Sequence, residues 1–195
     1  MKPLTLATVE AQLWTALEAG DSSEIDRLAA LLDRLDYDQA RQPQLLPSAL
    51  WYAAQGLHVF PLQPLYKVPW PRSRGFKDAT TDPLQIHQWW DSMPTANVGI
   101  ATGHRVDVID VDGPEGVKSW LDTHDLPPLL GQVSTPRPGG HHLYVPANPS
   151  RGNKAGLLPG VDYRGLGGYV VAPPSSTEVG TYEWFRPLDL EGAPA

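Results

Sequence analysis

The sequence of 195 residues contains no cysteine. This absence excludes disulfide bonds, thiol catalysis and cysteine-based zinc sites, and it fits a reducing cytoplasm. The sequence also lacks an apolar run of the roughly 20 residues that a helix needs to cross a bilayer. Its first residues lack the basic and then apolar pattern of a secretory signal peptide. We therefore expect a cytoplasmic protein with no membrane partner and no zinc.

Positive charge is also scarce. The chain has 22 acidic residues against 15 Lys and Arg, so its net charge is −7, which argues against a protein that binds nucleic acids by bulk electrostatics. Residues 1–60 hold eight of the acids and four of the bases, and the remainder of the chain holds 14 and 11. If three of those 14 acids hold metal ions, the remainder is close to neutral. The acidity therefore does not exclude a nucleic-acid partner.

The chain divides into three parts. Residues 1–45 are rich in Ala, Leu and acids and have helical periodicity with a break at residues 20–23, which predicts a helical hairpin appendage. Residues 46–187 contain short strand patterns between Gly and Pro turns, with few helices, which predicts an α+β domain. Residues 188–195 are expected to be a flexible tail or the start of a linker. Strands are predicted at residues 57–62, 97–101, 106–111, 132–135, 141–145, 161–165 and 168–172.

The stretch VIDVDGPEG, residues 108–116, ends an apolar run with two acids one residue apart. Side chains alternate between the faces of a strand, so Asp110 and Asp112 project to one side. Asp107 lies on the opposite face, where we expect it to be solvated. Gly113 and Pro114 end the strand and leave both carboxylates at its mouth, where they suit Mg²⁺ or Mn²⁺.

Two alternatives remain for this acidic pair. One is a surface turn with two solvated acids. The other is the DxD site of a haloacid dehalogenase-type phosphatase, which is weaker because Pro114 and Glu115 follow the Gly where that family usually has Thr or Val. No second acidic cluster of the expected kind follows downstream.

Two later stretches add polar residues. In STPRPGGHHLYV, residues 134–145, a Gly-Gly turn lets the backbone approach a ligand, and His142 starts a strand from which it can donate to a phosphate oxygen. A lone His of this kind is more often structural. In GVDYRGLGGYVVAPPS, residues 160–175, Asp162 precedes an apolar strand and Arg164 shares its face. A lone Asp near a turn is usually a turn residue, but here it follows a same-face acidic pair.

Taken together and in this order, VIDVDG, STPRPGGHHLYV and GVDYRGLGGYVVAPPS resemble the motifs of the bifunctional primase–polymerase (prim-pol) family, within the archaeo-eukaryotic primase superfamily. The upstream stretch ATTDPLQIHQWWDSMPTANVGIATG resembles the same family, so the resemblance covers residues 48–177. The turn STPRPGG is one residue longer than the family's common TPSGG. The implied fold is a prim-pol catalytic core with an RRM-like mixed or antiparallel sheet.

The resemblance implies a DNA primase and polymerase. Asp110, Asp112 and Asp162 would hold two Mg²⁺ or Mn²⁺ ions for nucleotidyl transfer, and His142 would contact the triphosphate of the incoming nucleotide. The expected partners are a single-stranded DNA template, NTP or dNTP, and a helicase or helix-bundle region of a larger parent protein, in the replication of a chromosome, plasmid or phage. A non-catalytic DNA- or nucleotide-binding module with the same fold is the alternative.

Basic residues supply candidate phosphate contacts. Arg137 and Arg164 are candidates for binding the nucleotide, since a guanidinium suits phosphate geometry. Residues 64–81 form a Pro-rich loop in which bases alternate with aromatic residues, as in single-strand binders. A solvated loop whose aromatic residues pack on the core is the alternative. The candidate template or phosphate contacts in this loop are Lys67, Arg72, Arg74 and Lys77.

Overall fold

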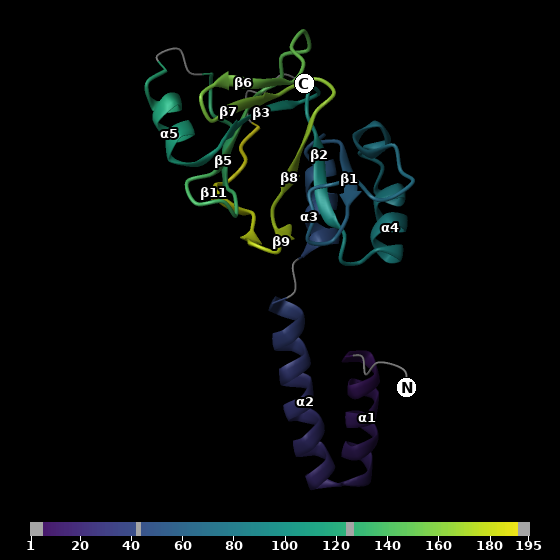
Figure 1. Cartoon of the computed structure of the whole chain (residues 1–195). Helices are drawn as coiled ribbons and strands as arrows, with labels where there is room; N and C mark the ends of the chain where they lie inside the picture. Colours follow the sequence, from purple (N-terminus) through teal and green to yellow (C-terminus); the bar gives the residue numbers. More distant parts are fainter. Residues whose placement is uncertain (1–5, 42–43, 124–126, 191–195) are drawn as a thin grey trace. The chain divides into compact units, whose positions relative to one another are not determined.

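The computed structural model describes residues 6–41, 44–123 and 127–190 (Figure 1). Contacts divide the chain into two compact units, Met1–Pro43 and Gln44–Ala195. The division falls two residues before the end of the predicted appendage. Among the described residues, no helix has both the length and the apolar character that crossing a membrane requires.

The first unit is a helical hairpin of α1 (Leu6–Ala19) and α2 (Ser22–Arg41). Asp21 begins the second helix, because its carboxylate accepts a hydrogen bond from the Glu24 amide at 3.1 Å. The helices pack through a small cluster of buried residues, Val9, Ala16 and Leu28. This cluster explains the spacing of apolar residues in the first forty positions.

A small antiparallel sheet in the second unit has the strand order β1-β2-β8, with β1 at Val59–Leu62, β2 at Asn97–Ala101 and β8 at Tyr169–Ala172. Helices α3 (Leu45–Ala54) and α4 (Pro83–Ser92) lie on this side of the unit (Figure 1). Asp82 caps α4 by accepting a hydrogen bond from the Leu84 amide at 3.0 Å. A short 3₁₀ helix, η1, spans Gly75–Asp78.

The larger sheet carries the motifs and has the order β11-β4-β5-β3-β7-β6. Helix α5 (Gly113–Leu121) lies beside it (Figure 1). Every strand pairing that the structure describes in these sheets is antiparallel, so the chain has the predicted α+β class with antiparallel rather than mixed sheets. The strands are β3 (Val106–Val111), β4 (Gly131–Ser134), β5 (His141–Pro146), β6 (Lys154–Leu158), β7 (Val161–Arg164) and β11 (Glu183–Arg186).

Alternation along β3 divides the interior into two cores. Val106 and Val108 face the core shared with the small sheet, α3 and α4. Ile109 and Val111 face a second core, to which Trp120 of α5 contributes. The seven predicted strands all occur, with shifts of one or two residues at some ends. The sequence did not predict β6, β11, or the pair β9 (Ser176–Thr177) and β10 (Gly180–Thr181).

The first three residues of the expected flexible tail are folded. Leu188 and Leu190 pack against the first core. The Asp189 amide also donates a hydrogen bond to the Leu130 carbonyl at 2.7 Å. Residues 188–190 therefore belong to the folded unit, and residues 191–195 lie outside the described part of the chain.

Asp107 is also not where the sequence suggests. It lies on the opposite face from Asp110, as predicted, but it is fully buried rather than solvated. Its carboxylate accepts hydrogen bonds from the Tyr163 hydroxyl and, at 2.8 Å, from the Asn148 amide. Burial of the phenol, followed by the hydrogen bond to Asp107, raises the pKa of Tyr163. Asp107 is thus a structural residue that ties β3 to β7 and to the loop after β5.

Substitution of Asp107 by Ala tests this assignment. The Tyr163 hydroxyl and the Asn148 amide would lose their acceptor, and leaving the buried Tyr163 donor unpaired costs about 1–3 kcal/mol of unfolding free energy. Urea denaturation monitored by circular dichroism measures the loss. Asp122→Ala is the control, because its ion pair with Lys118 is exposed and should contribute less than about 1 kcal/mol. Equal effects of the two substitutions would contradict the structural role of Asp107.

Candidate functional site

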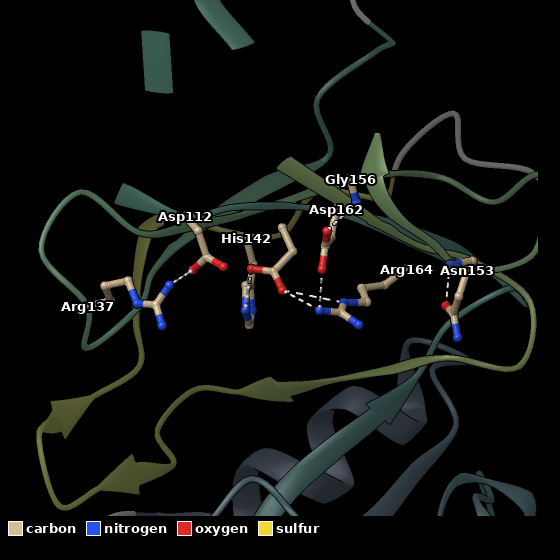
Figure 2. Close-up of polar contacts among 9 residues, drawn as sticks. Asp112, Arg137, His142, Asn153, Gly156, Asp162 and Arg164 are labelled. Atoms are coloured by element: carbon tan, nitrogen blue, oxygen red, sulfur yellow. Dashed lines mark hydrogen bonds and ion pairs between the residues drawn. The ribbon is translucent and has the colours of Figure 1, made fainter. Parts of the chain in front are cut away.

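The candidate site is built on three neighbouring strands of the large sheet. In the register of that sheet, Asp110 on β3 lies opposite His142 on β5 and opposite Asp162 on β7. Directly opposed residues of antiparallel strands project to the same face. Asp112 follows Asp110 by two residues, so its side chain projects to that face as well. Residues separated by up to 52 positions in the sequence thus form one polar row (Figure 2).

The end of β3 determines how open this row is. Val106 and Val108 occupy the same face and are fully buried, whereas the Asp110 side chain is 17% exposed and that of Asp112 is 45% exposed. Asp112 also precedes the first turn of α5, but its carboxylate makes no capping hydrogen bond to that helix. The face therefore changes from core to open site along a single strand, and the Asp112 carboxylate stays available to other partners.

Arginine side chains neutralise the carboxylates. Arg164 Nη2 donates to Asp110 Oδ2 at 3.1 Å and to Asp162 Oδ2 at 2.9 Å, so one guanidinium bridges two strands. Arg137 Nη1 lies 2.9 Å from Asp112 Oδ1 (Figure 2). The other Asp162 oxygen accepts the Gly156 amide at 2.8 Å. Arg137 and Arg164 are therefore brought to the predicted acids.

His142 is the most buried of the predicted site residues. Its Nε2 lies 3.6 Å from Asp110 Oδ1, and its ring lies 5.5 Å from the ring of Tyr182, which is also buried. Burial lowers the pKa of His142 to about 4, because desolvation and the positive charges of Lys67 and Arg164 outweigh the attraction of Asp110. The imidazole is consequently neutral at physiological pH and can donate one N–H without adding charge.

These side chains surround a cavity of about 330 Å³. The glycine-rich loop at residues 165–168 contributes to its wall. Two hydrogen bonds fix this loop, one from the Thr102 hydroxyl to the Gly165 carbonyl at 2.7 Å and one from the Gly165 amide to Asn153 Oδ1 at 3.1 Å. A Cβ atom at Gly168 would lie 2.2 Å from Asn153 Oδ1, so a larger residue would displace Asn153 from the cavity.

The predicted site residues fall into two groups. Asp110, Asp112, Arg137, His142, Arg164 and Lys67 line the cavity, and Asp162 joins them through Arg164. Arg72, Arg74 and Lys77, which share a loop with Lys67, do not line it. Arg74 instead pairs with Asp78 at 2.6 Å. The role of these three residues as template contacts stays a prediction.

Sequence reasoning missed Asn153 and Tyr182, which both line the cavity. Asn153 lies in the loop before β6, a strand that the sequence did not predict. Tyr182 follows the third motif by several residues and precedes β11. Neither lies in one of the three motifs, so no local signal indicated them.

Within the described residues, no group of three or more His, Cys, Asp or Glu side chains is gathered closely enough to hold a metal ion. The positions beside the carboxylates are taken by the guanidinium groups of Arg137 and Arg164. The donor set nevertheless suits a hard divalent cation, because it consists of three carboxylates on one sheet face, and Mg²⁺ and Mn²⁺ prefer oxygen ligands. Asp110, Asp112 and Asp162 thus fit such ions by their chemistry, provided that the arginines turn away.

A family model, "Bifunctional DNA primase/polymerase, N-terminal", matches residues 49–195. The chain belongs to this family. The match includes every residue of the site and leaves out the hairpin of α1 and α2. Membership places the prim-pol domain among proteins with a DNA primase/polymerase type of function. A search of curated proteins found no match.

The buried, neutral state of His142 predicts a specific loss of stability in acid. Its pKa rises from about 4 in the folded protein to an ordinary 6.5 on unfolding. As the pH falls from 6.5 towards 4, the unfolded chain takes up a proton that the folded protein refuses, and stability decreases by roughly 3 kcal/mol. Urea denaturation of metal-free protein at several pH values measures this decrease.

His142→Gln should remove this part of the pH dependence, whereas substitution of the exposed His87 by Gln should leave it unchanged. The difference between the two variants separates His142 from the carboxylates, which also titrate in acid. Nuclear magnetic resonance titration of the His142 ring gives an independent readout. A His142 pKa near 6.5 would show that the ring is solvated rather than buried.

Proposed function

We propose that the protein is a template-directed nucleotidyl transferase, a DNA primase and polymerase that joins nucleoside triphosphates on single-stranded DNA. One observation carries the proposal. Asp110 and His142 project from adjacent strands of a prim-pol domain into a cavity that also holds cationic side chains, and Asp162, opposite Asp110, joins them through Arg164. Carboxylates suited to divalent ions, next to groups suited to phosphate, are the combination that phosphoryl transfer requires.

Asp110, Asp112 and Asp162 are the proposed ligands of two Mg²⁺ or Mn²⁺ ions. Bound there, the ions would neutralise charge on the triphosphate and the leaving pyrophosphate and would lower the pKa of the attacking 3′-hydroxyl. The sheet register holds Asp110 and Asp162 side by side. Asp112, at the more exposed end of the row, can turn between Arg137 and a ligand.

The two arginines have a second role in this proposal. A guanidinium presents the same fork of donors to a carboxylate and to a phosphate. Without nucleotide, Arg164 offsets the repulsion between Asp110 and Asp162. If divalent cations occupied the carboxylates, Arg164 and Arg137 would be free to bind the phosphates of the nucleotide. The neutral His142 donates a hydrogen bond to a phosphate oxygen from a rigid, buried position.

The wider setting is part of the same proposal. A primer-forming enzyme needs a template and nucleoside triphosphates, both of which occur in the cytoplasm. We propose that it acts in the replication of a chromosome, plasmid or phage, together with a helicase or helix-bundle region of a larger parent protein.

One observation favours a second candidate, a non-catalytic prim-pol module that binds DNA or nucleotide. Each carboxylate of the row is paired with an arginine, and the described residues contain no ready metal cluster. Such a module would keep the paired arrangement and would leave the chemistry to another protein. No observation supports the phosphatase alternative.

Substitution of Asp112 by Ala separates the two candidates. In an enzyme, the change should reduce primer synthesis and extension to background with either Mg²⁺ or Mn²⁺, because one of the proposed ion ligands is gone. The half-exposed position of Asp112 leaves the core intact. Gel assays on single-stranded templates, with dNTPs and with NTPs, measure synthesis, and Asp91→Ala, at an exposed position on α4, is the control.

The wild-type protein supplies the decisive comparison. Unchanged synthesis by Asp112→Ala would show that the row does not hold the catalytic ions. Wild-type protein that binds single-stranded DNA and triphosphate without incorporating nucleotide would identify the binding module instead.

If Arg164 competes with divalent cations for Asp110 and Asp162, its removal should change the metal affinity. This change can be measured by a binding experiment that does not depend on catalysis. Arg164→Gln removes the cation that occupies Asp110 and Asp162, so Mn²⁺ affinity in the absence of nucleotide should rise by roughly tenfold, equivalent to about 1.4 kcal/mol. Electron paramagnetic resonance of free Mn²⁺ measures the binding. Arg186→Gln, on the exposed part of β11, is the control. Unchanged or weaker Mn²⁺ binding in Arg164→Gln would contradict the proposal that divalent cations replace Arg164 at Asp110 and Asp162.

A further inference from the structure

Lys67 is the one residue of the basic loop that lines the site cavity, although it precedes the first residue of β3 by 39 positions in the sequence. Several hydrogen bonds fix its backbone. The side-chain amide of the buried Asn97 on β2 donates to the Tyr66 carbonyl at 3.2 Å. The Tyr169 hydroxyl on β8 donates to the Lys67 carbonyl at 3.1 Å. The small sheet thus determines where the lysine enters the cavity.

The Lys67 side chain reaches the interior groups of the cavity. Its Nζ lies 5.8 Å from the centroid of the Tyr182 ring, and that ring also contacts His142. Burial raises the pKa of Tyr182, and the nearby Lys67 ammonium opposes that rise. The same charge contributes to the low pKa of His142. Lys67 and His142 therefore lie on one side of the cavity, with Tyr182 in contact with both.

Lys67 differs from the other cations of the cavity in its partners. Arg137 and Arg164 form ion pairs with the carboxylate row. In the described part of the chain, no carboxylate forms an ion pair with Lys67. Its neighbours are the ring of Tyr182 and the hydroxyl of that residue, with which it forms a hydrogen bond. An ammonium group has three donors, so donors remain for a ligand in the cavity. Its positive charge favours a ligand that carries negative charge.

We propose that Lys67 binds the triphosphate of the incoming nucleotide beside His142, rather than the template backbone. The inference rests on the proposed function. It follows from the division of the basic loop, since Arg72, Arg74 and Lys77 lie outside the cavity that contains Asp110 and Asp112. A contact with the template backbone would be expected among those outer residues. A cation that lines the cavity would instead meet the nucleotide that the acidic row is proposed to bind.

Lys67→Ala tests the proposal without endangering the fold, because the residue as a whole is exposed. We expect the affinity for the non-hydrolysable probe α,β-methylene-dATP to fall by roughly tenfold, a loss typical of one charge-assisted contact. Binding of dAMP and of a fluorescent single-stranded oligonucleotide should stay within twofold of wild type. In steady-state extension, the KM for dATP should rise while kcat changes little. Lys67→Arg should recover part of the affinity, and Lys118→Ala, on the exposed face of α5, is the matched control.

The outcomes are distinct. Weaker oligonucleotide binding with unchanged binding of the triphosphate probe would overturn the proposal and make Lys67 a template contact. Unchanged binding of both probes, or no binding of the triphosphate probe by the wild-type protein, would also overturn it. If wild-type protein binds the probe through Lys67 but incorporates no nucleotide, the proposed enzyme fails while the Lys67 assignment stands.

Discussion

The site depends on the register of β3 with its two neighbours. Asp110 lies opposite His142 on one side and Asp162 on the other, and a slip of one residue would turn these side chains to different faces. Apolar pairs on the opposite face resist such a slip, for example Ile109 against Leu143 and Tyr163. The buried Asp107 adds a polar constraint, because only the observed register brings its carboxylate to the Tyr163 hydroxyl. The contacts on the face of β3 that carries Asp107 and Ile109 thus fix the register that aligns Asp110 with His142 and Asp162 on the other face.

Charge balance is the second condition for this arrangement. Three carboxylates close together in a partly buried row repel one another unless cations offset them. Arg137 and Arg164 do so within the chain, and in the proposal they pass to the phosphates when divalent ions bind. A triphosphate that arrives with divalent ions brings little net charge, so the exchange keeps the cavity near neutrality throughout. Lys67 forms no ion pair with a described carboxylate, so in the proposal it binds the ligand without first leaving such a partner.

The sequence predicts those parts of the fold and the site that depend on local patterns. Alternation in VDVIDV predicted that Asp110 and Asp112 share a face, and spacing predicted the same of Asp162 and Arg164. The burial of Asp107 was not predictable, because its partner Tyr163 is 56 residues away and only the sheet brings the two together. The position of Lys67 depends on contacts with Asn97 and Tyr169, which no local pattern reveals. Strand β6 was missed because three of its five residues are exposed and its pairing with β7 is irregular.

The paired arginines are compatible with an enzyme because the two ion pairs differ in their surroundings. The Arg137 and Asp112 side chains are 61% and 45% exposed, and ion pairs at such positions contribute only about 0–1 kcal/mol. The Arg164 bridge is less exposed and joins two carboxylates, so more free energy is needed to break it. In the proposed enzyme, Asp112 would therefore be the carboxylate that becomes available first, and Asp110 and Asp162 would follow only when a ligand replaces the charge of Arg164. Under this proposal, the ion-paired state would be the resting form of the site, and the Arg164 ion pairs would break only when cations and nucleotide bind.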